Sequence, residues 1–260
     1  MDLRELWSYR ELLYFLIWRD VLVRYKQAVL GVAWAVLQPF LTMIVFTVVF
    51  NRLLKVSSPR ADVPYEVFSF SGLLAWQFFA GALSRSGSSL VGNANLLTKI
   101  YFPRLVIPLA AVLAGLVDFV ISFVILLILM GAYGIAPGWQ TVFVPLFLLL
   151  AVLTALSVSL WLSALNVLYR DVAYAIPFLV QLWMFLSPVI YSMEKIHGTV
   201  LRVVYSLNPM TGVIGGFRWA LLGDQFPNGY FWISIGVVLV LFLGGLFYFK
   251  RMERVFADVV

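Results

Sequence analysis

The stretch IWRDVLVRYKQAVLGVAWAVLQPF, residues 17–40, joins a charged segment to an apolar one without a break. Its first ten residues hold four charged side chains, Arg19, Asp20, Arg24 and Lys26. The apolar part that follows is typical of the start of a membrane-spanning helix. The stretch therefore raises two questions: which side of a membrane the charges face, and what they contact.

The composition of the chain is strongly apolar. Of its 260 residues, 63% are hydrophobic and 12% are charged, with a mean hydropathy of +1.00. A soluble domain is about half apolar and about a quarter charged, so the composition indicates an integral membrane protein. The absence of cysteine and the single histidine exclude disulfides, thiolate metal sites and sites that need two imidazole groups. Charges interrupt the N-terminal segment, so we expect no cleaved signal peptide.

Six segments are apolar enough to cross a bilayer, which takes about 20 residues in a helix. We place them at residues 31–53, 67–86, 106–133, 141–165, 173–192 and 229–249. They predict an all-α membrane protein with one transmembrane domain, between an interface segment at 1–30 and a tail at 250–260. Six crossings put both termini on one side, where 12 of the 18 Lys and Arg residues lie. Because basic residues concentrate in cytoplasmic loops, both termini are expected in the cytoplasm.

The segment before the first span has the pattern of an amphipathic helix. On a helix, one face would carry Tyr14, Trp18, Val21, Leu22 and Tyr25, with the charges on the other side. This pattern predicts a helix along the cytoplasmic membrane surface, with its arginines against anionic lipid or an acidic partner. A basic anchor with no further role is the alternative. Apolar residues also surround its first half, so we expect it to pack against protein as well as lipid.

Two connecting segments have patterns of their own. In the cytoplasmic loop 91–108, Asn93 or Asn95 could cap a short helix that Pro103 ends, although an ordinary connector is also compatible. The external segment 193–228 holds two apolar pieces, LRVVYSL and MTGVIGGFRWALLG, separated by Asn208-Pro209. Each piece is too short to cross a membrane, which favours re-entrant or interfacial helices.

Motifs for catalysis are absent from the sequence. It contains no phosphate-binding loop of the form G-x-x-x-x-G-K-[ST], no zinc-binding His pair and no G-x-S-x-G motif. Asp118 is the one charge within the third span, where an ionised carboxylate costs roughly 2.5–3.5 kcal/mol. It could serve a proton or cation relay, or it could be a buried carboxyl bonded to a neighbouring helix.

Aromatic and proline residues mark the spans. Phe, Trp and Tyr make up 17% of the chain, and a tunnel lined with such rings would suit a carbohydrate polymer. Core packing is the alternative for each of the rings inside the spans, among them Trp76, Phe78, Phe79, Trp183 and Phe185. Pro39, Pro177 and Pro188 each predict a kink in a span.

Several motifs together resemble a known family. The N-terminal pattern WRD-x-x-x-RYKQ-x-x-LG-x-x-W-x-x-x-QPF begins at Trp18 and ends at Phe40. Further motifs are Asn95-Leu96-Leu97 with Lys99, Phe102-Pro103, Tyr169-Arg170-Asp171, Ser187-Pro188-Val189-Ile190-Tyr191 and Asn208-Pro209. In this order, over essentially the whole chain, they resemble the permease subunit of bacterial polysaccharide ABC exporters of the type-two export class. The resemblance is strongest to the O-antigen lipopolysaccharide exporter, and teichoic acid and capsule exporters are relatives.

The resemblance implies an assembly and a substrate. Two six-span permeases would form a homodimer over two separate ATPase subunits, which would hold ATP and magnesium. The substrate would be a polysaccharide on undecaprenyl diphosphate, moved across the bacterial inner membrane. This chain would therefore be no enzyme and would bind no cofactor, metal or nucleic acid.

Site residues follow in three groups. Contact with the ATPase is assigned to the interface helix, the 91–103 loop and the loop after the fourth span, at Arg19, Asp20, Arg24, Asn95, Leu96, Lys99, Tyr169, Arg170 and Asp171. The channel or its external gate, with two re-entrant helices, is assigned to Trp76, Phe79, Trp183, Ser187, Pro188, Tyr191, Asn208 and Pro209. As a separate hypothesis that the family does not supply, Arg24 and Lys26 contact the lipid diphosphate.

Two other classes of protein compete with this interpretation. An ion-coupled secondary transporter would need several ionisable groups within the spans and often internal repeats, whereas the sequence offers Asp118 alone. A membrane enzyme of carrier-lipid metabolism would need a cluster of acid, base or metal-binding residues. The external carboxylates that could form one are Asp62, Glu66, Glu194 and Asp224.

Overall fold

The computed structural model describes residues 7–26, 33–99, 101–193, 198–226, 228–253 and 256, and the regular structure in these ranges is entirely helical. Its elements are α2 (Arg10–Lys26), α3 (Ala33–Phe46), the π-helix η1 (Thr47–Leu53), α4 (Tyr65–Gly92), α5 (Ala94–Lys99), α6 (Val106–Leu113), α7 (Gly115–Ala132), the 3-10 helix η2 (Trp139–Phe143), α8 (Val144–Leu168), α9 (Val172–Phe185), α10 (Thr199–Ser206), α11 (Pro209–Leu222) and α12 (Asn228–Met252). Gln27, Leu30 and Gly31 of the N-terminal motif, and Glu194, lie outside the described residues.

Five of the helical segments are long and apolar enough to cross a membrane, which makes this a multi-pass membrane protein. They are residues 36–53, 65–92, 106–132, 139–168 and 229–252. The predicted span at 173–192 is helical only in its first part, because α9 ends at Phe185 and turns follow. Pro188 lacks the N–H that would continue the helix. The 14 residues of α9 span about 21 Å, less than the roughly 30 Å hydrocarbon core.

Several spans contain a proline or an irregular segment. Pro39 and Pro177 lie inside α3 and α9, and the kinks expected there stay predictions. The first span also has an irregular part without proline, the π-helix η1, which follows Phe46. The third span is divided at Ala114, between α6 and α7.

Helix α4 runs through the centre of the bundle and packs against α8, α6, α7, α11, α9 and α3. It extends to Gly92, beyond the predicted end at residue 86, and so includes the polar run SRSGSSL. The hydroxyls of this run donate to backbone carbonyls: Ser84 Oγ to Ala80 O at 3.0 Å and Ser89 Oγ to Ser86 O at 2.7 Å. Ser86 Oγ donates instead to Pro108 O of α6 at 3.4 Å. Because each hydroxyl has an acceptor, a polar segment can remain helical inside the bundle.

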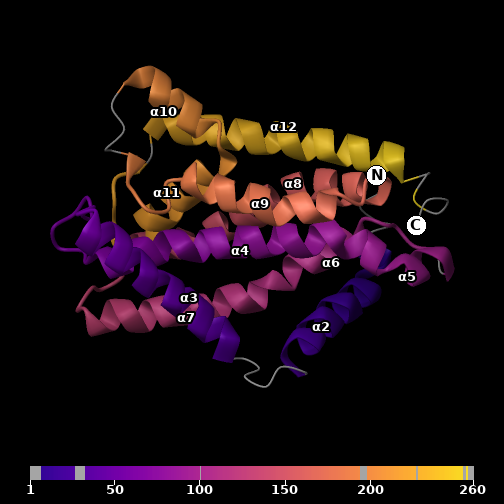
Figure 1. Cartoon of the computed structure of the whole chain (residues 1–260), viewed down its shortest axis with the longest axis horizontal. Helices are drawn as coiled ribbons and strands as arrows, with labels where there is room; N and C mark the ends of the chain where they lie inside the picture. The colour runs from indigo at the N-terminus through magenta and orange to yellow at the C-terminus, as the bar shows by residue number, and fades with distance from the viewer. Residues whose placement is uncertain are drawn as a thin grey trace.

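The helices run back and forth along the long axis of the molecule (Figure 1). α4, α8 and α12 point one way, and α6–α7 and α9 point the other. The start of α2, α5 and the end of α12 lie at one end, which we call the terminal end. α10, α11 and the loop between η1 and α4 lie at the opposite end.

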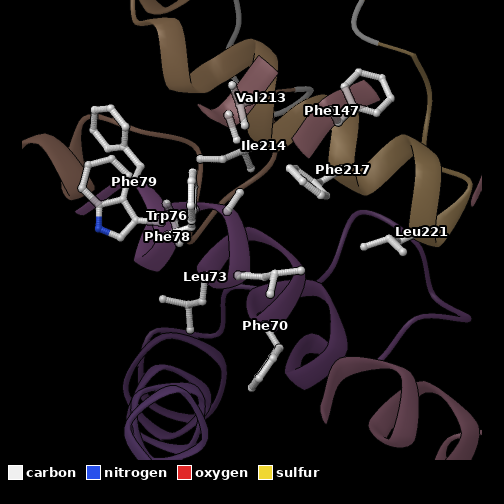
Figure 2. Packing of buried hydrophobic residues seen from close by; sticks show 14 of the residues in the cluster. Phe70, Leu73, Trp76, Phe78, Phe79, Phe147, Val213, Ile214, Phe217 and Leu221 are labelled. Atoms are coloured by element: carbon white, nitrogen blue, oxygen red, sulfur yellow. The ribbon is translucent and has the colours of Figure 1, made fainter. Parts of the chain in front are cut away.

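A large aromatic and aliphatic core joins α4, α8 and α11. Figure 2 shows Val213, Ile214 and Phe217 of α11 beside Phe147 of α8 on one side of α4, whereas Phe70 and Leu73 of α4 point to its other side. A second cluster at the terminal end contains Leu16 of α2, Leu97 of α5 and Phe249 of α12. It therefore fixes the first half of α2 against the bundle, as its apolar residues predict.

Gly216 of α11 lies against the ring of Phe147 on α8. A Cβ there would lie 2.2 Å from Cδ1 of Phe147, whose ring is packed against Phe217, Trp219 and Phe231. Gly216→Ala is therefore expected to lower the free energy of unfolding by about 1–2 kcal/mol, despite the better helix propensity of alanine. Thermal unfolding in detergent measures it. Gly236→Ala, where no atom lies within 4 Å, is the control and should not be destabilised.

Candidate functional site

Charged side chains from three helices meet at Asp118. Arg24 and Tyr25, near the end of α2, each bond to the Asp118 carboxylate on α7. Nη1 of Arg85, on α4, lies 3.6 Å from the same carboxylate. The side chains of Arg24 and Arg85 are each 27% exposed, so the group is half-buried. One carboxylate therefore balances two guanidinium groups, and the cluster keeps a net positive charge.

Burial raises the pKa of Tyr25 to about 12, and its bond to Asp118 acts in the same direction. The phenol therefore stays protonated at neutral pH and donates its hydrogen bond to the carboxylate. A carboxylate that two arginines and a phenol already contact is poorly placed to carry a cation. The geometry thus favours the ion-paired alternative for Asp118 over a relay.

Two glycines leave room for the Arg85 guanidinium. A Cβ on Gly81 would lie 2.8 Å from Nη1 of Arg85, and one on Gly115 would lie 2.2 Å from Nη2. Arg85 Nε also donates to the carbonyl of Ala111 at 3.3 Å. The guanidinium thus lies in a groove between α4 and α7 that side chains at 81 and 115 would fill.

The cluster lines a cavity of about 590 Å³ between α2, α3, α4 and α7. Its polar wall includes Arg24, Tyr25, Gln38, Thr42, Gln77, Ser84, Arg85, Asp118 and Ser122. Its apolar wall includes Trp34, Leu73, Leu74, Trp76, Phe119 and Met184. The cavity can therefore hold an anion and an apolar or ring-shaped group side by side.

Helix α2 meets the bundle with more than one of its sides. Of its aromatic face, Tyr14 is 67% and Trp18 52% exposed, whereas Tyr25 bonds to Asp118. Leu16 and Arg24, on another side of the helix, also contact the bundle. From the terminal end, α2 runs obliquely toward the middle of the long axis (Figure 1), where Arg24 and Tyr25 meet Asp118 of α7. That the helix lies along the membrane surface stays a prediction.

The residues predicted to contact an ATPase lie mainly at the terminal end. α5 is a six-residue helix on which Asn95 and Lys99 are exposed, shorter than the predicted one. Asn93 precedes it, and its carbonyl accepts from Leu96 N at 2.9 Å, while Leu96 itself is partly buried. The exposed segment Tyr169-Arg170-Asp171 joins α8 to α9. Arg19 and Asp20 pair with each other at 2.8 Å on α2.

At the opposite end, Asn208 connects α9 to α11. Its Oδ1 accepts from Met210 N at 3.0 Å, capping α11, and from Trp183 Nε1 at 2.9 Å. Its Nδ2 donates to Ser187 Oγ at 2.8 Å and to Leu186 O at 3.2 Å. Pro209 occupies the first turn of α11, where its missing N–H costs nothing. The predicted gate residues Trp183, Ser187 and Asn208 thus form one hydrogen-bonded network.

Other predicted gate residues are buried in the core. Phe79 is 0% and Trp76 3% exposed, and their ring centroids are 5.4 Å apart. Phe79 also meets Trp183 edge to face at 5.1 Å. Trp76 contributes to the wall of the cavity described above, whereas Phe79 serves the packing between α4 and α9.

Arg218 on α11 is a functional candidate that the sequence did not reveal. It is 4% exposed and donates to three carbonyls, those of Pro188 and Val189 at 2.7 Å and of Tyr191 at 3.1 Å. Its guanidinium also lies 3.7 Å from the ring centre of Phe68. The Ser187–Tyr191 motif is therefore held through its backbone, and Pro188 and Tyr191 belong to the same region as Asn208.

The loop between η1 and α4 is tied to the end of α11. Arg60 Nη1 donates to Leu222 O at 2.6 Å, and its Nε donates to Asp62 Oδ1 at 2.9 Å. The Arg60 guanidinium beside Asp62 holds the pKa of that carboxyl below its ordinary value. Within the described residues, no group of three or more His, Cys, Asp or Glu side chains could hold a metal ion.

Arg85 and Arg218 escaped sequence analysis for the same reason. Both were counted as loop charges on either side of the membrane, yet both lie in helices that pack inside the bundle. Gly81, one turn before Arg85, was the available signal that a close neighbour needed room.

Asn208→Ala is expected to lower the free energy of unfolding by about 1–2 kcal/mol, because it removes the cap of α11 and leaves Trp183 Nε1 without its acceptor. Asn208→Asp keeps the acceptor and should lose less. Thermal unfolding in detergent compares the two. Equal losses in both variants would contradict this account of the cap.

Comparison with known proteins identifies the family. The family model described as ABC-2 type transporter matches residues 11–222, most of the chain and nearly all of the elements above. The chain belongs to the ABC-2 type transporter family. This ABC-2 protein is 32% identical to the O-antigen export system permease protein RfbA of Myxococcus xanthus over 92% of this chain and 91% of the relative. It is 30% identical to RfbA of Klebsiella pneumoniae, over 93% and 92% of the two chains, and 23% identical to the polysialic acid transport protein KpsM of Escherichia coli, over 90% and 91%.

Proposed function

We propose that this chain is the transmembrane subunit of an ATP-driven exporter that moves a polysaccharide linked to undecaprenyl diphosphate, most specifically O-antigen, across the bacterial inner membrane. The observation that carries the proposal is the 32% identity to an O-antigen export permease over nine-tenths of both chains. The sequence has no phosphate-binding loop, so ATP and magnesium would bind to a separate ATPase subunit and this chain would catalyse no reaction.

The proposed assembly is a homodimer of this chain over two ATPase subunits. α9, with the turns that follow it, would be the sixth crossing, and α10 and α11 would be re-entrant from the external side. Support comes from the surface of α9, where Phe178 is 63% and Phe185 50% exposed. A second copy or the polymer would cover these rings. Both termini would then be cytoplasmic, in keeping with the distribution of basic residues.

We assign contact with the ATPase to α5, through Asn95, Leu96 and Lys99, and to the loop Tyr169-Arg170-Asp171. On α2, Arg19 and Asp20 would form the outer part of the same contact and Arg24 its inner end. Because the natural chain has no cysteine, single cysteines at 95 and 169 provide a clean cross-linking test. Disulfide or maleimide cross-links to the ATPase are expected from both positions. A cysteine at Val142, which is 80% exposed at the opposite end, should give none.

We assign the external gate to the network of Trp183, Ser187 and Asn208, with Pro188, Tyr191 and Pro209 around it. Trp76 and Phe79 would support it from the core. At the inner end, Arg24 would contact the lipid diphosphate, and Lys26 would contribute its charge at longer range. Arg24 is at present engaged by Asp118, whereas Lys26 is exposed at the end of α2.

The proposal is tested by isolating this chain from its native membranes in mild detergent. Mass spectrometry of the eluate should find a stoichiometric partner with a phosphate-binding loop, and the eluate should hydrolyse ATP. Cells that lack the chain should accumulate lipid-linked polymer inside. If the chain purifies alone, under conditions that keep other membrane complexes intact, the proposal of an ATP-driven exporter would be overturned.

The relative KpsM supports a second candidate, a capsular polymer as substrate, and teichoic acid is a further one. The polymer that accumulates in the deleted strain decides between them. An ion-coupled transporter remains the rival from another class. The contacts of Asp118 with Arg24 and Arg85 weigh against it, because they occupy this carboxylate, the one charge predicted within a span.

A further inference from the structure

The cavity beside Asp118 carries more positive than negative charge. Arg24 and Arg85 converge on one carboxylate, and Arg85 reaches it only at 3.6 Å, beyond ordinary hydrogen-bond length. Asp118 thus neutralises one guanidinium and leaves the donors of the other only partly used. A ligand with more negative charge and more acceptor oxygens could satisfy both.

The guanidinium of Arg85 is pre-positioned. Gly81 and Gly115 leave the space that it occupies, and its Nε is bound to Ala111 O. A fixed, planar guanidinium is suited to phosphate oxygens, which it can bind through two parallel hydrogen bonds. Arg24 approaches from α2, a separate helix, so the two cations can clasp a group between them.

The remaining walls of the cavity indicate what carries the phosphate. Gln38, Gln77 and Ser122 offer amide and hydroxyl groups, while Trp34 and Trp76 offer ring faces. A volume of about 590 Å³ accommodates far more than inorganic diphosphate. A headgroup joined to sugar on one side and to a lipid chain on the other fits this mixture.

We propose that Arg24 and Arg85 bind the diphosphate of a lipid-linked glycan, and that Asp118 pairs with these arginines only while the site is empty. The choice of ligand rests on the proposed function. Arg85, and not Lys26, is the second cation in contact with the diphosphate, because Arg85 lines the cavity whereas Lys26 is exposed at the end of α2. When the diphosphate enters, the Asp118 carboxylate is displaced from Arg24, because two anions cannot share the same donors.

The direction in which one substitution changes the affinity for diphosphate distinguishes this exchange from a merely structural ion pair. Asp118→Asn removes the competing anion, so the diphosphate is expected to bind about 10-fold more tightly. Arg85→Gln and Arg24→Gln each remove a charge-assisted contact and should weaken binding roughly 10-fold or more. Arg85→Lys keeps the charge but not the planar guanidinium, so its affinity should lie between those of Arg85→Gln and the unchanged chain. Lys26→Gln should change affinity less than about 3-fold.

The experiment uses the full chain in nanodiscs of phosphatidylcholine, with undecaprenyl diphosphate as the probe and native mass spectrometry to count bound lipid. Arg52→Gln, which removes an exposed arginine from η1, controls for loss of positive charge. Each variant is first checked by gel filtration, and Arg85→Lys replaces Arg85→Gln if the latter does not fold.

Three outcomes would overturn the proposal. Weaker binding in Asp118→Asn would make the aspartate structural. Equal affinity for phosphatidylglycerol would identify the ligand as an ordinary phospholipid headgroup, and inorganic diphosphate that binds as tightly as the lipid would remove the role of the lipid. None of these results bears on whether an ATPase co-purifies or a polymer accumulates, so failure here is distinct from failure of the proposed function.

Discussion

Arg218→Leu is expected to be among the most destabilising single substitutions in this protein, with a loss of about 3–5 kcal/mol in the free energy of unfolding. The guanidinium donates to the carbonyls of Pro188, Val189 and Tyr191 inside the bundle. Without it these carbonyls are buried and unpaired, and each unsatisfied group costs roughly 1–3 kcal/mol. The contact with the Phe68 ring is lost as well.

Thermal unfolding in detergent measures the effect, and the melting temperature should fall by about 10 °C. Arg52→Leu is the matched control, because Arg52 is exposed in η1 and should change stability little. Arg218→Lys should recover only part of the loss, since one ammonium cannot reproduce the planar fork. A similar fall in the Arg218→Leu and Arg52→Leu variants would refute the role of the buried guanidinium.

The hydrophobic pattern predicted the helical architecture well, because long apolar runs in a membrane protein have one low-energy backbone conformation. The two short helices around Asn208-Pro209 were also predicted, since a capping residue followed by proline is a local signal. The ends of α4 and α9 were wrong by several residues. Serine hydroxyls that bond to the preceding turn extended α4, and Pro188 stopped α9 early.

The candidate site was less predictable than the fold. Sequence reasoning found Arg24 and Asp118 as separate unusual charges, 94 residues apart, but gave no means of pairing them. The sequence did not indicate how α2 contacts the bundle: Tyr14 and Trp18 are exposed, whereas Tyr25 of the same face bonds to Asp118. Helical periodicity identifies faces, whereas only tertiary contacts decide which face turns inward. Arg85 was missed because its partners lie on other helices.

The contribution of Arg24, one of the charges in residues 17–40, to stability can be tested through its cluster with Asp118 and Arg85. Asp118→Asn is expected to lower the free energy of unfolding in the absence of lipid diphosphate by about 3 kcal/mol. It leaves Arg24 and Arg85 facing each other in a half-buried site with no anion between them. Arg24→Gln should cost less, because Asp118 still has Arg85 as a partner and the residual charge falls to zero.

The double variant Arg24→Gln/Asp118→Asn decides whether charge balance is the cause. It removes one cation together with the anion, so it should be more stable than Asp118→Asn alone, which additive single effects would forbid. Undecaprenyl diphosphate should restore the melting temperature of Asp118→Asn, in which both arginines remain, and should not restore that of the double variant. Additive losses in the double variant would show that Asp118 acts through packing. In that case α2 would be held by its apolar contacts around Leu16, and the arginine would add no charge-dependent coupling between α2 and the bundle.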